Sequence, residues 1–398
     1  MLIDGRRQHD RCGPSKRIPS LDGLRAISIV LVLCGHLEGT YGFYNNAAVW
    51  NHLGDFANFG VRVFFVISGY LITLLLLKET EKTGTISLKQ FYIRRAFRIF
   101  PASYSLILIV TAMYYLGAIR LNRYDLLHAY TYTMNYSAGR SWWLGHLWSL
   151  SVEEQFYLLW PATLLFLGIR KGLRAAVVVV IVVPFVRLGT DYMWVGQRPI
   201  IGSTFQTIAD TIATGCILAG YKDDLLRLPW FRRIIDSRVF FLIPLFALAL
   251  NLKNTGRLSW FVFETLMNVA IALCICRVTT HTQDWAGKLL NWRPIVFVGV
   301  LSYSLYVCQQ LFINRNSGAW PERFPQNLIL ACCAAMLCHY CIERPFLRLR
   351  DKKRSSHPVL AKTGAETASP MPSISVLSGV ELALASSPPP VDDATGGL

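Results

Sequence analysis

Apolar residues are arranged along this chain in long runs that few charges interrupt. A helix needs roughly 20 mostly apolar residues to cross a bilayer. Ten runs meet or approach that length, covering about 22–41, 58–77, 99–117, 146–168, 175–188, 201–220, 239–251, 259–277, 294–313 and 326–344. The runs 175–188 and 239–251 are short, and the aromatic segment 124–136 is too polar to cross and predicts an interfacial or re-entrant element. The pattern predicts an all-α, polytopic membrane helix bundle of about ten transmembrane helices.

The composition agrees with this pattern. Hydrophobic residues make up 53% of the 398 positions and charged residues 16%, against about 25% charged residues in soluble domains. These values exclude a disordered or fibrous chain and disfavour an ordinary soluble protein. The net charge of +16 does not indicate nucleic-acid binding, because the basic residues are scattered between apolar runs.

Lysine and arginine are distributed unevenly between the two sides of the predicted bundle. With the N-terminus inside, 28 of the 40 basic residues fall in cytoplasmic segments and 8 in outside segments, as the positive-inside rule requires. An additional span at 124–136 would move Arg170, Lys171 and Arg174 outside. We therefore expect a multi-pass protein of the cell (inner or cytoplasmic) membrane with both termini cytoplasmic.

The two ends of the chain differ from the apolar part. Residues 1–17 are a basic cytoplasmic tail, and the run after them lacks a small-residue cleavage pattern, which favours an uncleaved first span. Residues 351–398 are rich in Ser, Pro, Ala and Gly and predict a disordered cytoplasmic tail. Because no soluble catalytic domain is expected at either end, any chemistry is expected within the membrane domain, residues 18–350.

Cysteine usage predicts neither a disulfide framework nor a metal site. Nine of the ten cysteines lie in apolar runs, where Cys behaves as a small hydrophobic residue. Cys338 and Cys341 flank His339, but no second pair completes a ligand set. No metal is expected.

The first run contains two ionisable side chains, which are costly at membrane depth and usually functional. Arg25 and His36 are eleven residues apart, or three helical turns plus about 20°, so both project from one face about 16 Å apart. Arg25 alone is also compatible with snorkelling to the interface, and His36 alone with a packing role. Their shared face favours a functional pair.

The fourth run carries a second cluster of ionisable residues. His146 lies at its outer end, and Glu153, seven residues later, projects from the same helical face, with Glu154 beside it. The predicted topology brings both carboxyl groups to a depth comparable with that of His36. An imidazole held by a carboxylate is a common general-base arrangement.

Three arginines precede the third run. Arg94, Arg95 and Arg98 have helical spacing and predict a cluster at the cytoplasmic membrane surface. Arginine binds phosphate groups well, so this cluster is a candidate site for a phosphorylated cofactor such as a coenzyme A ester. Anchoring to anionic lipid is the alternative.

The second run carries Arg62 near its outer end and Ser68 and Gly69 at its middle. The Ser-Gly pair indicates either a substrate passage or nucleophile, or close helix packing, which small residues permit. Arg62 and Arg25 are also the candidates for a purely structural ion pair with the glutamates of the fourth run.

The predicted outer face is aromatic. Such rings suit sugar stacking, but interfacial belts have the same composition. The residues concerned are Tyr41, Phe43, Tyr44, Trp50, Trp142, Trp143 and Trp148.

Seven segments, in order, resemble the motifs of the membrane acyltransferase-3 family. They are SLDGLRAISIVLVLCGH, FGVRVFFVISGYLIT, FYIRRAFRIFPA, HLWSLSVEEQFYLLWP, FQTIADTIATGCILAG with Asp210, VGVLSYSLYVCQQLF and CIERPFLRLR. The resemblance covers about residues 18–350. It implies a ten-span protein that moves an acyl group, commonly acetyl from acetyl-CoA, onto sugar hydroxyls. Acceptors in the family include lipopolysaccharide, exported polysaccharide and peptidoglycan.

The resemblance also implies roles for individual residues. Catalytic roles fall to Arg25, His36, Glu153 and Glu154, and acyl-CoA binding falls to Arg94, Arg95 and Arg98. We further expect substrate contacts from His146, Trp148 and Ser68. The chain departs from the family pattern at Cys308-Gln309, where many members have Trp-His, and at Arg62, where an acidic residue is frequent. A fused esterase-like domain, which some members possess, is not expected.

We therefore expect an integral membrane O-acyltransferase that uses acyl-CoA as co-substrate and binds no resident cofactor. Its expected partners are acyl-CoA, a carbohydrate or lipid-linked glycan acceptor and membrane lipids, and no nucleic acid. The alternative is a transporter or flippase that uses the Arg, His and Glu residues as a proton relay. Transporters usually contain paired internal repeats, and the sequence has none that is evident. A sugar-binding membrane subunit without activity is a third hypothesis.

Overall fold

The computed structural model describes residues 18–43, 53–194, 196, 200–252 and 256–355. The chain divides into two units, Met1–Asp351 and Lys352–Leu398. The basic tail at 1–17 and all but the start of the tail expected at 351–398 lie outside the described residues.

The described part of the chain contains helices and no strand. The longer helices carry the predicted apolar runs: α1 (Pro19–Leu37), α3 (Leu53–Thr83), α4 (Leu88–Tyr115), α7 (Leu147–Leu167), α8 (Ile169–Met193), α9 (Phe205–Arg227), α11 (Leu242–Leu252), α12 (Glu264–Thr280), α14 (Arg293–Cys308) and α15 (Gln326–Leu337). Shorter α-helices connect or extend them: α5 (Asp125–Tyr130), α6 (Trp142–Gly145), α10 (Pro229–Asp236), α13 (Trp285–Leu290) and α16 (Arg344–Ser355). The remaining turns are η1 (Met134–Tyr136), η3 (Arg238–Phe241), η4 (Ser259–Phe263), η5 (Gln309–Leu311), η6 (Trp320–Glu322) and η7 (Cys338–Glu343). The all-α prediction is confirmed.

Among the described residues, seven helical segments are long and apolar enough to cross a membrane. An eighth is possible if the pair Pro229–Asp236 and Arg238–Leu252, bent by 68°, counts as one broken span. Each of the ten predicted runs contains a helix, but α7 and α9 do not meet the same hydropathy criterion. Both carry acidic residues within the bundle, Glu153 and Glu154 on α7 and Asp210 on α9, and these lower their mean hydropathy.

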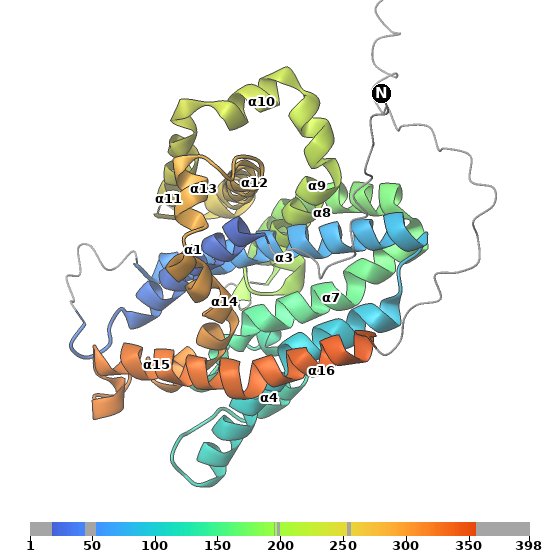
Figure 1. The fold of residues 1–398 in the computed structure, drawn as a ribbon. Coiled ribbons are helices and arrows are strands. Elements are labelled where there is room, and N and C mark those ends of the chain that lie inside the picture. Colours follow the sequence, from blue (N-terminus) through green and yellow to red (C-terminus); the bar gives the residue numbers. More distant parts are fainter. Residues whose placement is uncertain (1–17, 44–52, 195, 197–199, 253–255, 356–398) are drawn as a thin grey trace, which may run out of the picture. The chain divides into compact units, whose positions relative to one another are not determined.

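Helix α3 occupies the middle of the first unit, with α1 along one side and α9 along another (Figure 1). Glycines allow α3 and α9 to approach closely. A Cβ atom at Gly69 would overlap the carbonyl oxygen of Ile212, and one at Gly215 would overlap that of Val66. Gly69 therefore permits the close packing of α3 against α9, one of the two roles that the sequence allowed for the Ser-Gly pair. Ser68 faces α7 instead, where it donates to Glu153.

The segment expected to be interfacial or re-entrant forms α5 and η1. Within it, Tyr132 has a φ of 52°, which is unusual for a bulky residue. Its ring stacks on Phe100, with centroids 5.6 Å apart, and its hydroxyl lies 2.6 Å from Ser103 Oγ. Because Ser103 lies halfway along α4, the segment turns back toward the middle of that helix. Burial raises the pKa of Tyr132, so the hydroxyl keeps its proton.

Between α15 and α16 the helix widens into one π-helical turn, η7. Such turns insert a residue and rotate the side chains that follow. Glu343, at the end of η7, is fully buried and accepts a hydrogen bond from Ser304 Oγ at 2.8 Å. The turn therefore carries an acidic side chain into the bundle.

Candidate active site

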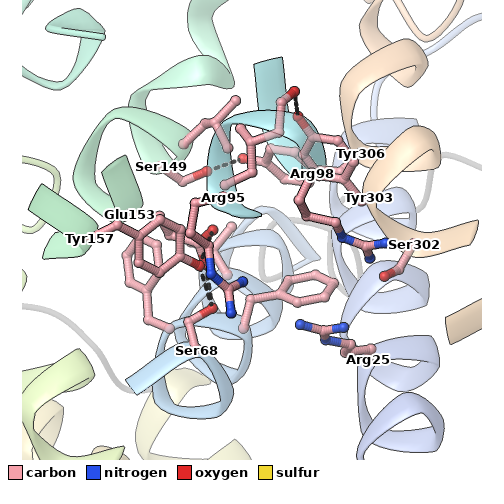
Figure 2. Close-up of a pocket in the computed structure, with 15 residues that line it drawn as sticks. Arg25, Ser68, Arg95, Arg98, Ser149, Glu153, Tyr157, Ser302, Tyr303 and Tyr306 are labelled. Atoms are coloured by element: carbon pink, nitrogen blue, oxygen red, sulfur yellow. Dashed lines mark hydrogen bonds between the residues drawn. The ribbon is translucent and has the colours of Figure 1, made fainter. Parts of the chain in front are cut away.

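Five helices, α1, α3, α4, α7 and α14, surround a cavity that contains about 690 Å³ of space, part of it open to solvent. Its guanidinium groups, those of Arg25, Arg95 and Arg98, turn toward the same space (Figure 2). The other residues that line it are Val61, Phe64, Phe65, Ser68, Ile99, Ser149, Leu150, Glu153, Tyr157, Ser302, Tyr303 and Tyr306. The cavity therefore combines three cations, one carboxylate and a hydroxyl-rich wall.

Helical spacing explains how the arginines reach this cavity. Arg25 lies in the second turn of α1, and Arg95 and Arg98 are one turn apart on α4. Residues three apart share a helix face. Arg94 has turned away from the cavity, and its Nη2 lies 2.7 Å from Glu79 Oε2. The predicted cluster of three arginines is thus divided, with two in the cavity and one paired outside it.

Glu153 is held by two hydroxyl groups. Ser68 Oγ donates to its Oε1 at 2.7 Å and Tyr157 OH donates to its Oε2 at 3.3 Å. Both donors also line the cavity. These two donors hold the carboxyl group of Glu153 in a fixed position at the wall of the cavity. The structure thus brings together Ser68, Glu153 and Arg25, which the sequence placed on three different spans.

The three cavity arginines have different partners. Arg98 Nη1 lies 2.7 Å from the buried Glu343 Oε1, and Arg25 Nη1 lies 3.9 Å from Asp22 Oδ1. Arg95 has no acidic partner among the described residues, and its guanidinium lies 5.4 Å from the centre of the Tyr157 ring.

His36 lies apart from the arginines, at the other end of α1. Its Nδ1 is 3.1 Å from Gln309 Oε1, and its ring meets the edge of Trp142, with centroids 5.8 Å apart. Arg315 donates to the carbonyl oxygen of Gly35 at 2.5 Å and lies over the Trp142 ring. These contacts fix the end of α1 and the plane of the imidazole.

His146 lies beside α14 with both ring nitrogens occupied. Nδ1 is 2.7 Å from Gln310 Oε1 and Nε2 is 3.1 Å from the carbonyl oxygen of Val307. Tyr306 OH donates to the carbonyl oxygen of His146 at 2.9 Å and lies 2.6 Å from Ser149 Oγ. Since Tyr306 and Ser149 line the cavity, they connect it with His146.

The structure differs from the expectation that a glutamate of α7 holds His36. In the part of the chain that the structure describes, no hydrogen bond joins His36 to Glu153 or Glu154. Helix α7 places His146, and not Glu153, close to the end of α1, because two helical turns separate these residues along α7. Glu153 instead lies at the level of Arg25, which lines the same cavity.

Glu154 and Trp148 lie outside that cavity lining. The Oε1 atom of Glu154 is buried without a hydrogen-bond partner among the described residues. The Trp148 ring meets the edge of Phe65 at 6.1 Å, and the Arg140 guanidinium lies 5.8 Å from its centre.

Arg62 belongs to a second, separate charge network. It pairs with Glu264 at 2.8 Å, and Glu264 also meets Arg187 at 3.0 Å. Arg187 in turn pairs with Asp210. The network is closed and neutral, so the alternative of an ion pair between Arg62 and the α7 glutamates is not what the structure contains.

Several site residues had no strong signal in the sequence. Gln309 and Gln310 are uncharged, although an amide pair inside an apolar run is unusual. Glu343 lies at the end of the expected span 326–344, and its direction depends on the π-helical turn. The cavity tyrosines were not distinguishable from an interfacial belt. Among the described residues, no group of three or more His, Cys, Asp or Glu is arranged to hold a metal ion.

The helical bundle and its buried polar cavity define a multi-pass membrane protein. Its sequence matches the model of the acyltransferase-3 family, described as an acyltransferase domain, over residues 18–344. The chain therefore belongs to this family, as its motifs predicted.

Curated relatives are similar over most of the chain. The peptidoglycan O-acetyltransferase OatA of Listeria monocytogenes is 31% identical over 343 residues, which are 73% of this chain and 49% of the relative. The O-acetyltransferase OatA of Staphylococcus aureus (strain MRSA252) is 30% identical over 408 residues, 91% of this chain and 63% of the relative. The chain thus spans about half to two thirds of the length of these relatives. No solved structure matches it.

Proposed function

We propose that the chain is an integral membrane O-acyltransferase. It moves an acyl group, acetyl in the simplest case, from acyl-CoA to a hydroxyl of a carbohydrate or glycolipid of the cell envelope or of an exported polysaccharide. Family membership and the names of the relatives support O-acetyl transfer. The observation that carries the proposal is the cavity in which Arg25, Arg95 and Arg98 meet Glu153.

The arginines are the proposed site for the donor phosphates. Guanidinium groups form paired, charge-assisted hydrogen bonds with phosphate oxygens. Arg95 and Arg98 lie near the start of α4, directly after a connection that the positive-inside rule assigns to the cytoplasm. A cytoplasmic donor would therefore reach them first, and its pantetheine arm would extend past Ser149 and Tyr306 toward the histidines.

His36 is the proposed base or acyl carrier. As a base, it takes the proton of the acceptor hydroxyl while that oxygen bonds to the thioester carbonyl carbon. The C–S bond then breaks, and the imidazolium returns the proton to the leaving sulfur. As a carrier, His36 first takes the acyl group from sulfur and then passes it to the hydroxyl. Both routes need a neutral imidazole.

The acceptor is proposed to approach from the outer side of the membrane. Trp148 offers a ring face for a sugar, and His146 lies beside it. Glu154, with its unpartnered buried oxygen, is an acceptor for a substrate hydroxyl. Ser68 acts here through Glu153, to which it donates.

A ten-span topology completes the proposal. Helices α7 and α9 are long enough to cross the bilayer, at 21 and 23 residues, and their polar residues face other helices. With these two and the broken pair α10–α11 counted as spans, every connection alternates sides and both termini are cytoplasmic. The basic start of α8 then stays inside.

Transfer from labelled acetyl-CoA tests this function. Membranes that contain the chain are incubated with the donor and with envelope glycans, and ester-linked label is measured. The wild-type chain should form the ester, while His36→Ala and Glu154→Gln, expressed at wild-type levels, should reduce its rate by about 100-fold or more. Normal ester formation in both variants would contradict the enzyme proposal. Movement of an unmodified glycan across the membrane without ester formation would instead support a transporter.

A further inference from the structure

The adjacent residues Gln309 and Gln310 contact His36 and His146 respectively, but the two contacts differ. Gln310 and Val307 together engage both ring nitrogens of His146. Gln309 engages only Nδ1 of His36, at 3.1 Å. No hydrogen bond reaches Nε2 of His36 from any residue that the structure describes.

Gln309 is fully buried, yet its polar contacts are few. Its side-chain oxygen faces His36, and its Nε2 is buried with no partner among the described residues. A buried amide group whose N–H donors have no partner costs folding free energy, so its presence calls for a functional explanation. Packing alone would not require an amide at position 309, so the contact with His36 is the explanation that we consider.

The oxygen of Gln309 determines which nitrogen of His36 carries the proton. An amide oxygen only accepts hydrogen bonds, so it selects the tautomer with hydrogen on Nδ1. The lone pair of a neutral ring is then on Nε2. Each ring nitrogen of His146 instead lies within 3.1 Å of an acceptor oxygen, so neither is open to an incoming group.

We propose that Gln309 is a positioning residue that holds Nδ1–H of His36, so that Nε2 of this histidine, and not of His146, takes the acceptor proton or the acyl group. The inference rests on the proposed function for the identity of the reaction. It adds the reacting atom and the residue that orients it. A neutral amide, where a carboxylate is common in such pairs, also leaves the imidazole less basic.

The charged and titratable surroundings of His36 are few. His146 faces it from the junction of α6 and α7, and Arg315 from the loop after η5. Glu38 follows at the end of the same helix. Residues 56–60 of α3, which packs against α1, are uncharged. Residues 302–308 of α14, which also packs against α1, carry the hydroxyl groups of Tyr303 and Tyr306 and the thiol of Cys308 as their titratable groups. A charge introduced at position 309 would therefore be the dominant change at the ring.

Carbethoxylation by diethyl pyrocarbonate tests the free nitrogen without any acyl transfer. The reagent modifies unprotonated imidazole nitrogen, and peptide mass spectrometry distinguishes the histidines. In the purified full chain, His36 should react at least about tenfold faster than His146. Equal rates, or faster reaction at His146, would overturn the proposal.

The pH dependence of this labelling tests the role of Gln309. Gln309→Glu keeps the size of the side chain and puts a carboxylate against the ring. The pH at half-maximal labelling of His36 should then rise by about one to two units. Gln206→Glu, the same change at an exposed site on α9, should leave it unmoved. An unshifted value in folded Gln309→Glu protein would overturn the assignment.

Kinetics separate this inference from the proposed function. Gln309→Leu should lower kcat for acetyl transfer by about 10- to 100-fold, with little change in the KM for acetyl-CoA. Unchanged kcat in this variant would overturn the positioning role while the enzyme proposal stands. Absence of transfer by the wild-type chain, with the labelling pattern as expected, would overturn the proposed function and leave the free Nε2 established.

Discussion

Arg95 is the cavity arginine whose charge is least compensated. Arg98 has the buried Glu343 at 2.7 Å, and Arg25 has Asp22 at 3.9 Å. In the described part of the chain no ion pair joins Arg95 to an acidic residue, and its guanidinium faces the rings of Phe91 and Tyr157. Its N–H donors are therefore the ones most available to an anionic group in the cavity.

Replacement of Arg95 should weaken donor binding. A hydrogen bond to a charged group contributes about 1.5–3 kcal/mol, so Arg95→Ala should raise the KM for acetyl-CoA by about 10- to 100-fold. Steady-state kinetics on membranes of matched protein content measures this change. Arg94→Ala is the matched control, because Arg94 pairs with Glu79 outside the cavity lining. A KM that rises equally in both variants would indicate a general effect of surface charge.

At the scale of helices, the packing of α3 explains how the adjacent residues Ser68 and Gly69 contribute both to the cavity and to helix packing. Gly69 lies against α9, and the adjacent Ser68 donates to Glu153 on α7. Neighbouring residues of a helix point about 100° apart, so one residue fixes the distance to α9 while the next reaches the cavity. The sequence allowed packing and function as alternatives for this pair, and the structure contains both a packing contact and a site contact.

A Cβ atom at Gly215 should force α3 and α9 apart. Gly215→Ala would place this atom against the carbonyl oxygen of Val66. Overpacking of this kind costs about 1–3 kcal/mol, so the variant should unfold at a lower temperature in detergent. Gly139→Ala is the control, because no atom lies within 4 Å of the added Cβ. Equal melting temperatures for the two variants would show that the helices adjust without cost.

The sequence predicted helices better than it predicted contacts. Apolar runs and charge placement located a helix in each of the ten segments, because burial in lipid requires long apolar stretches. Spacing also predicted the shared face of Arg95 and Arg98, which both line the cavity, whereas the depth expected for Glu153, level with His36, differs from its place beside Arg25. It could not give the partner of His36, since an uncharged Gln309 in an apolar run has no electrostatic signal. Nor could it separate Arg94 from Arg98, whose partners lie far away in sequence.

At the scale of the whole membrane unit, the chain separates two groups of buried charges. One is the open cavity of α1, α3, α4, α7 and α14. The other is the closed network of Arg62, Arg187, Asp210 and Glu264. Helix α3 contributes to both. Breaking a buried ion pair by removing one partner costs about 3–5 kcal/mol. The closed network therefore holds α3 in place, and α3 forms one wall of the cavity.

Labelling from outside the cell should verify the alternating topology. With α7 as a span, Gly139 lies outside and Lys171 inside. Gly139→Cys should therefore gain reaction with a membrane-impermeant maleimide in intact cells, above the level of the wild-type chain. Lys171→Cys should gain it only after the membrane is opened. Labelling of both positions in intact cells would show that α7 does not cross the membrane.

The contact between Arg98 and Glu343 has a consequence for ligand selection. A guanidinium that already has an internal anion within 2.7 Å does not act as an open trap for chloride or inorganic phosphate. An incoming polyanion must exchange places with the carboxylate, and only one that reaches Arg25 and Arg95 at the same time recovers the lost attraction. Selectivity for a large, multiply charged donor over small ions would then follow from displacement of the protein's own counter-ion.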